Sequence, residues 1–82
     1  MDYIERAELA RTWKKRFDKI KRAAIKNGEH MSQEQFCKNA PYKIDGAQLC
    51  HYFSGKNVPW TKNCIALENY IIAEEIRLGV RK

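Results

Sequence analysis

The amino-acid sequence predicts a small all-α domain of four to five helices, with long first and last helices. Apolar residues recur every three or four positions in both the N-terminal and the C-terminal thirds, which is the period of an amphipathic helix. Glycine or proline separates these segments, as expected between helices. Since the chain contains no repeat, linker or low-complexity segment, we expect residues 1–82 to form one domain with one modest core.

A two-sided helix is predicted over residues 3–27. Its apolar face consists of Tyr3, Ala7, Ala10, Trp13, Phe17, Ile20 and Ala24. The opposite face is a basic ridge that consists of Arg11, Lys15, Lys19, Arg22 and Lys26. Both sets recur at intervals of three or four residues, so each set occupies one side of the helix. Gly28 is expected to end the helix, because glycine readily adopts the left-handed conformation of a C-cap.

A short helix is predicted to begin at Ser32. The Ser32 hydroxyl can accept a hydrogen bond from the backbone N–H of Gln35, and the Gln35 side chain can return to Ser32, which is the pattern of a capping box. Met31 and Phe36 occupy the positions of a hydrophobic staple around this start. The helix is expected to end two residues before Pro41, because a proline disfavours helical geometry at the preceding residue.

A second short helix is predicted over residues 46–54. Asp45 is suited to cap its N-terminus, and Gln48 stands at the position of a second capping-box partner. Gly55 is expected to end this helix.

The last helix is predicted over residues 62–78, with Thr61 as its N-cap and Gly79 beyond its end. It carries two apolar stripes. One stripe is Cys64, Leu67, Ile71 and Leu78, and the other is Ile65, Ile72 and Ile76. A helix that packs only on its own domain needs one stripe. The second stripe therefore predicts a partner surface, most simply a second copy of the chain.

The net charge of +6 favours an anionic partner, with nucleic acid ahead of membrane. Residues 1–26 hold nine bases and four acids, and therefore carry +5 of this charge. Residues 27–59, in contrast, hold three bases and three acids. The basic ridge thus either contacts phosphates or forms a solvated face.

The composition argues against a metal site, a disulfide framework and an enzyme. Cys37, Cys50 and Cys64 are 13 and 14 residues apart, which matches no metal-binding spacing, so we expect buried free thiols rather than a zinc set completed by His30 and His51.

No cofactor is predicted. The chain shows no catalytic triad spacing and no glycine-rich phosphate loop, so no enzyme activity is predicted. It also lacks a signal-peptide pattern and a long apolar run, which predicts a soluble, cytoplasmic protein.

Two segments in the middle of the chain carry a family resemblance. Residues 32–37 read Ser-Gln-Glu-Gln-Phe-Cys, and residues 49–59 read Leu-Cys-His-Tyr-Phe-Ser-Gly-Lys-Asn-Val-Pro. They resemble the Ser-Gln-Glu-Glu-Leu-Ala and Ile-Ser-x-Trp-Glu-x-Gly-Lys-x-x-Pro segments of phage-repressor-type (Cro/Xre-like) helix-turn-helix proteins. The turn between the two helices is about two residues longer here. Residues 59–68 are also similar to small phage regulators such as the anti-CRISPR-associated repressors.

The resemblance implies a sequence-specific regulator of transcription that binds double-stranded DNA, namely a dimeric repressor of a phage or other mobile element in a bacterial host. Phe36 and Leu49 would be core residues, and the helix over residues 46–54 would lie in the major groove. The base-reading residues would be Gly46, Ala47, Gln48, Cys50 and His51. Phosphate contacts would come from Gln33, Lys43, Ser54, Lys56 and Asn57, together with the basic ridge. Two copies would pair through Ile65, Ile72 and Ile76 and bind an inverted-repeat operator, with no small-molecule ligand.

A second hypothesis is a helical protein-interaction module that uses the helix-turn-helix as a scaffold. An antirepressor, an antitoxin-like protein or another phage inhibitor would fit this description. The neutral charge of residues 27–59 keeps this alternative open, because a DNA-reading segment commonly brings positive charge.

Overall fold

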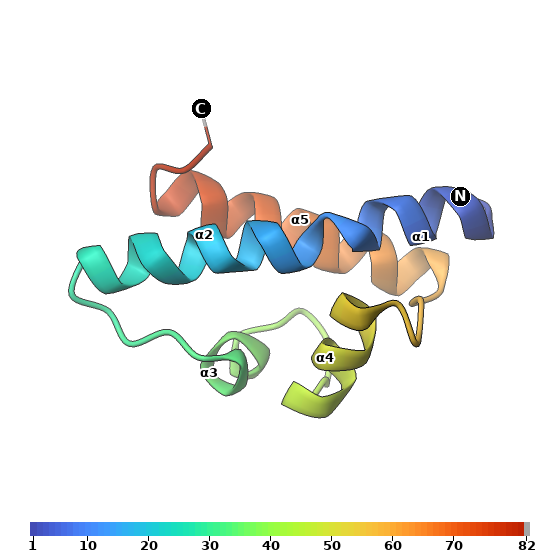
Figure 1. Cartoon of the computed structure of the whole chain (residues 1–82), viewed down its shortest axis with the longest axis horizontal. Helices are drawn as coiled ribbons and strands as arrows, with labels where there is room; N and C mark the ends of the chain where they lie inside the picture. The colour runs from blue at the N-terminus through green and yellow to red at the C-terminus, as the bar shows by residue number, and fades with distance from the viewer. Residues whose placement is uncertain (82) are drawn as a thin grey trace.

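Five helices make up the regular structure of residues 1–81, which the computed structural model describes; Lys82 lies outside the described residues. They are α1 (Tyr3–Arg11), α2 (Trp13–Lys26), α3 (Gln33–Lys38), α4 (Gly46–Ser54) and α5 (Thr61–Arg77). The all-α class is confirmed, since no strand occurs within residues 1–81. Figure 1 shows α1 and α2 running nearly end to end along α5, with α3 and α4 on one side of this pair.

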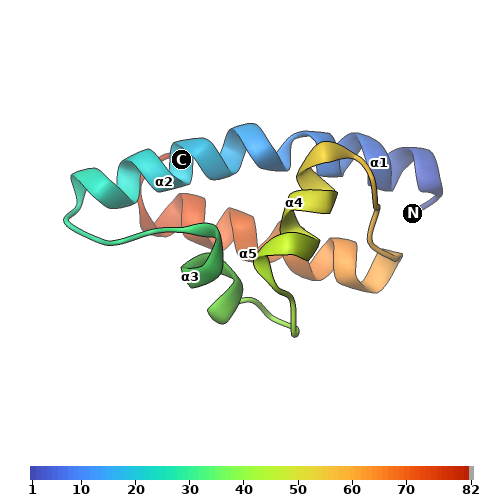
Figure 2. The ribbon, with the colours of Figure 1, turned by 60° about the horizontal axis from the view of Figure 1, so that its bottom comes forward.

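The long first helix is interrupted at Thr12, so the prediction of a single helix over residues 3–27 was wrong at this residue. The backbone N–H and the hydroxyl of Thr12 both donate to the carbonyl of Leu9, over 3.0 and 2.7 Å. A threonine hydroxyl that bonds a carbonyl of the preceding turn competes with helical hydrogen bonding and bends the helix. α1 and α2 are therefore separate elements, although they continue almost in line (Figure 2). Gly28, with φ of +79°, follows the end of α2 as predicted.

The start of α1 lies beyond the core, which corrects the predicted inner position of Tyr3. The Tyr3 residue is 61% exposed, and Arg6 is the residue that is buried at this end of the helix. Nη1 of Arg6 donates to the carbonyl of Pro59 over 2.8 Å. Its guanidinium carbon lies 5.7 Å from the ring centre of Tyr3 and 5.2 Å from that of Trp60. Arginine suits this position because its stem is apolar and its planar head stacks on aromatic rings.

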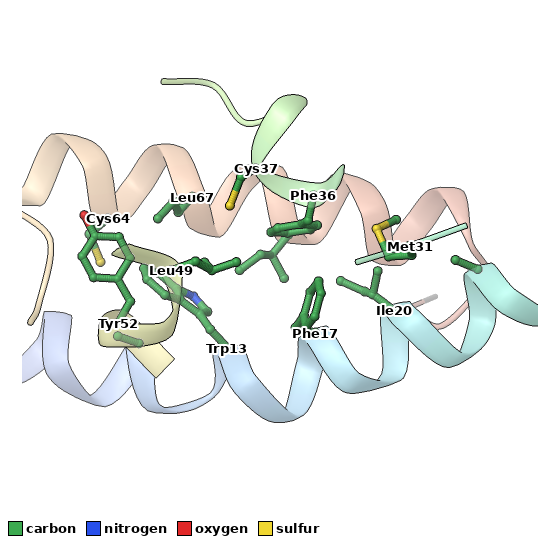
Figure 3. Close-up of a cluster of buried hydrophobic side chains, with 13 residues drawn as sticks. Trp13, Phe17, Ile20, Met31, Phe36, Cys37, Leu49, Tyr52, Cys64 and Leu67 are labelled. Carbon is green, nitrogen blue, oxygen red and sulfur yellow. The ribbon is translucent and has the colours of Figure 1, made fainter. Parts of the chain in front are cut away.

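The core lies between the α2–α5 pair and the two short helices, as Figure 3 shows. Trp13 and Phe17 of α2 are buried, which confirms their predicted place. The Phe17 ring meets the Phe36 ring edge-on with centroids 5.0 Å apart, and Phe36 also packs against Tyr70 at 4.6 Å. Phe36 and Leu49, each 1% exposed, join α3 and α4 to this cluster. Burial of these side chains therefore holds both short helices in place.

Both short helices begin at the predicted caps. The Ser32 hydroxyl accepts from the Gln35 N–H over 3.1 Å, and the Asp45 carboxylate accepts from the Gln48 N–H over 2.8 Å. The return hydrogen bonds from the two glutamine side chains do not form within residues 1–81, so each capping box has only one of its two hydrogen bonds. Met31 is buried, as a staple residue should be.

α5 begins one residue earlier than predicted. Trp60 occupies the N-cap position with an extended backbone and Thr61 is already helical, so the predicted Thr61 cap was wrong. The Thr61 hydroxyl instead donates to the carbonyl of Met1 over 3.2 Å, which ties the N-terminus to the start of α5. Of the two predicted stripes, whose orientation the sequence left open, the one with Cys64, Leu67 and Ile71 is the inner stripe that faces the core. Cys64, Leu67 and Ile71 are fully buried, and Leu78 is half-buried.

A charged cluster joins α2 to α5 beside the core. The Arg16 guanidinium donates to the Glu68 carboxylate over 2.7 and 2.9 Å and to the Glu75 carboxylate over 3.1 and 2.7 Å. Trp13 Nε1 donates to Glu68 over 3.0 Å, and Arg81 Nε donates to Glu75 over 3.2 Å. The Arg16 hydrogen bonds hold the pKa of Glu75 below its usual range, although burial opposes this shift. The same carboxylates raise the pKa of Arg16, so the Arg16–Glu75 pair stays ionised.

Candidate nucleic-acid interface

α4 is fixed to the domain by one side and exposed on the other. Its inner residues are Leu49 and Tyr52, at 1% and 4% exposed, together with the half-buried Phe53. The Phe53 ring packs against Phe17 with centroids 5.6 Å apart, and the Tyr42 hydroxyl donates to that of Tyr52 over 3.3 Å. The outer residues, which we call the exposed face of α4, are Ala47, Cys50, His51 and Ser54. A short helix held in this way presents one face to a partner.

The five predicted base-reading residues do not share one face. Ala47, Cys50 and His51 are exposed, but Gly46 and Gln48 are half-buried at the two edges of α4. Gly46 faces α3, where an added Cβ would meet Glu34 Cγ at 4.0 Å. Gln48 borders a hollow whose other lining residues are Tyr42, Lys43, Ile44, Asp45, Tyr52 and Asn63. The prediction that Gly46 and Gln48 share one exposed face with Ala47 is thus corrected, because a step of 100° per residue turns each of them to one side of Ala47.

The cysteines differ in burial. Cys37 and Cys64 are buried, and burial raises the pKa of both thiols, as expected for inert core cysteines. Cys50 lies on the exposed face of α4, so the prediction of a buried thiol was wrong there. Its position between Leu49 and His51 on a one-sided helix explains the exposure, since Leu49 takes the inner site.

The residues predicted to contact phosphates around α4 lie at both of its ends. Lys43 precedes the helix, and Lys56 and Asn57 follow it, all three exposed; Gln33, at the start of α3, is half-buried. The segment after α4 is shaped by local bonds: Gly55 has φ of +81°, which suits only glycine without strain, and the Asn57 N–H donates to the carbonyl of His51 over 3.3 Å.

Ser54 and Arg11 meet at the C-terminal end of α4. The Ser54 hydroxyl donates to the His51 carbonyl over 3.2 Å. Arg11, the first residue of the basic ridge, lines a hollow together with Ser54, Gly55 and Val58. Arg11 is therefore the ridge residue that the structure places beside α4.

The rest of the basic ridge lies on a different side of the molecule. Lys15, Lys19, Arg22 and Lys26 are exposed on the outer side of α2. α4 packs on the inner side of α2, through Phe53 on Phe17. These cations therefore point away from α4, with α2 itself between them and the exposed face of α4.

The second apolar stripe of α5, which we call the isoleucine stripe, is turned away from the core. Ile65 is 46% exposed and Ile76 58% exposed, whereas Ile72 is half-buried. These residues are at the surface of α5, which agrees with their predicted separation from the inner stripe.

A second exposed apolar group was missed at the sequence level. It consists of Met1, Tyr3, Ile4 and Trp60, and Trp60 is 77% exposed. A usable signal was the adjacent pair Tyr3 and Ile4, since neighbouring helical residues diverge by 100° and both cannot face the core.

Two kinds of site do not occur in the described part of the chain. Residues 1–81 bring together no group of three or more histidine, cysteine or acidic side chains that could hold a metal ion. None of the five helices is long and apolar enough to cross a membrane.

Comparison of the chain with models of known protein families, with curated proteins and with solved structures gives no match.

Proposed function

We propose that this protein is a sequence-specific regulator of transcription that binds double-stranded DNA and places α4 in the major groove. The observation that carries the proposal is the one-sided anchoring of α4. Leu49 and Tyr52 fix the helix, while its exposed face carries only short or neutral side chains. The major groove, about 12 Å wide, admits an α-helix, and a face without acidic residues can approach the bases.

The exposed face offers distinct contacts to base edges. His51 can donate to N7 or O6 of guanine, and the Ala47 methyl can pack on the methyl group of thymine. Gln48, at the edge of α4, reaches bases only at the border of the groove. Lys43 and Lys56 stand at opposite ends of the helix, where they would bind phosphates and fix its register.

The isoleucine stripe supports a two-fold dimer as the form that binds DNA. Two copies joined through Ile65, Ile72 and Ile76 would present two α4 helices to successive major grooves, with half-sites roughly 34 Å apart. Such a dimer would bind an inverted repeat and repress a promoter by occupying it. We place this activity in the cytoplasm of a bacterium that carries a phage or other mobile element.

Selection from a random-sequence duplex pool at near-physiological salt tests the proposal. An enriched inverted repeat is the expected result. His51→Glu should abolish the enrichment, because it replaces a donor by a carboxylate on the exposed face of α4. His30→Glu is the matched control, since it makes the same change at the other exposed histidine, which lies outside α4. No enrichment with the wild-type protein, or equal enrichment with both variants, would contradict the role of α4.

The second candidate is a protein-interaction module, favoured by the exposed isoleucine stripe and by Trp60. The salt dependence of binding separates the two functions. Duplex binding should weaken with salt with a log–log slope of about −0.9 for each neutralised phosphate. Binding of a protein through the isoleucine stripe should change little, because apolar burial is not screened by salt.

A further inference from the structure

The outer side of α2 carries four cations that the proposed α4 contact does not use. Lys15, Lys19, Arg22 and Lys26 follow one another at intervals of three or four residues. From the first to the last the row extends eleven residues, or about 16 Å at 1.5 Å per residue. We call these four residues the α2 cation row.

Two acids close to this row in the sequence, Asp18 and Glu29, are paired with other cations. Asp18 binds Lys14 over 2.7 Å, and Glu29 binds Arg77 over 2.9 Å. Glu68 and Glu75 are held by Arg16, which lies on the same helix but faces α5. None of the four cations forms a salt bridge with a residue in the described part of the chain, although the Arg22 side chain donates to the backbone carbonyl of Asp18 over 3.4 Å. The positive charge of the row is therefore uncompensated.

The chemistry of the row fits a phosphate backbone better than a protein. Lysine is depleted in protein–protein interfaces, which are anchored by buried aromatic or aliphatic side chains. The one aromatic residue between these cations along α2 is Phe17, and it is buried, so no aromatic side chain is exposed within the row. Rows of lysine and arginine are, in contrast, the usual partners of phosphate oxygens.

We propose that the α2 cation row binds the backbone of a duplex segment separate from the one that α4 reads, so that one molecule contacts two segments. The separation follows from the geometry, because α2 stands between the row and the exposed face of α4. The binding of one segment by α4 rests on the proposed function, whereas the charge of the α2 cation row does not.

Binding to a 20-bp duplex of mixed sequence, measured over a range of salt, tests the row itself. Lys19→Gln combined with Arg22→Gln should make the log–log salt slope shallower by roughly 1.8, which is 0.9 for each lost phosphate contact. Lys38→Gln combined with Lys62→Gln is the matched control, because it removes the same charge from exposed sites outside α2. The control should keep the wild-type slope. Equal slopes for the two double variants would overturn the proposal.

Capture of a second duplex tests the separation of the two segments. Protein bound to an immobilised mixed-sequence duplex should retain a labelled one, and the Lys19/Arg22 variant should retain several-fold less than the Lys38/Lys62 variant. Equal retention would overturn the proposal. Polyglutamate provides a further test. If it binds as tightly as the duplex and depends equally on Lys19 and Arg22, the partner of the row is an acidic protein instead of DNA.

The failure of this proposal differs from the failure of α4 reading. If the Lys19/Arg22 variant changes the salt slope and the capture but no sequence is enriched, only the sequence-specific reading by α4 is removed. If a sequence is enriched but the substitutions at Lys19 and Arg22 change neither the salt slope nor the capture, only the role of the α2 cation row is removed.

Discussion

Arg16 lies between two carboxylates of α5 that would repel each other without it. Its side chain is 16% exposed, and the side chains of Glu68 and Glu75 are 15% and 10% exposed. We expect Arg16→Met to lower the free energy of unfolding by about 3 kcal/mol, because removing one partner leaves buried charge uncompensated. Urea unfolding at neutral pH measures this loss. Lys19→Met, at an exposed site on the same helix, should change stability by less than about 0.5 kcal/mol. Similar values for the two variants would show that the cluster adds no stability.

The same cluster predicts how stability depends on acid. Arg16 lowers the pKa of Glu75 in the folded state below the ordinary glutamate value of about 4.3. A lowered folded pKa contributes stability that is present above the unfolded pKa and is lost as pH falls through the folded pKa. The wild-type protein should therefore lose stability below about pH 4. Arg16→Met should lose less over the same range, as followed by thermal unfolding between pH 6 and pH 2. A parallel decline in both proteins would contradict this assignment.

Single residues show what periodicity can and cannot predict. Trp13 and Phe17 were placed correctly because they repeat on one face of a helix. Arg16 was not recognised as a residue that pairs with α5, because a basic residue in a basic helix is expected to be solvent-exposed. The informative signal lay elsewhere: Glu68 and Glu75 are seven residues apart and so share one side of α5, next to its buried stripe.

At the scale of single elements, α4 depends on its first cap. The Asp45 carboxylate accepts from the Gln48 N–H, and the helix is only nine residues long. Asp45→Ala should reduce stability by about 1 kcal/mol, whereas Asp45→Asn should retain most of it, because asparagine also caps helices. Chemical denaturation of the three proteins measures both effects. An equal loss in the two variants would show that the charge of Asp45, rather than its hydrogen bond, stabilises α4.

Element boundaries were predictable where local chemistry decides them. Ser32 and Asp45 act on backbone N–H groups three residues away, Gly55 acts through its own backbone conformation, and all three boundaries are confirmed. The interruption at Thr12 was missed because threonine occurs both within and at the ends of helices, and its hydroxyl bond to Leu9 forms only in the folded geometry. The start of α5 was missed because Thr61 bonds the distant Met1 instead of capping.

The whole molecule is organised around the α2–α5 pair, which separates three surfaces. The exposed face of α4, the α2 cation row and the isoleucine stripe each lie on a different element and none faces the core. The cation row and the isoleucine stripe were predicted because each repeats along one helix, whereas the exposed face of α4 was predicted from the family resemblance and only in part. Their relative directions were not predictable, because they depend on contacts between distant residues such as Phe17 and Phe53. That packing turns the cation row away from α4.

The isoleucine stripe makes a prediction about the oligomeric state. Ile76→Asp should give a folded monomer, because Ile76 is 58% exposed and its loss removes apolar area only from a contact between copies. Ile25→Asp is the matched control, since Ile25 of α2 is 59% exposed and lies outside the stripe. Sedimentation velocity over a concentration series should show a dimer for the wild type and Ile25→Asp and a monomer for Ile76→Asp. The monomer should also bind the inverted repeat more weakly, because it can no longer couple two half-sites. A wild-type protein that stays monomeric throughout the series, or an Ile76→Asp protein that dimerises like the control, would show that the stripe does not pair two copies.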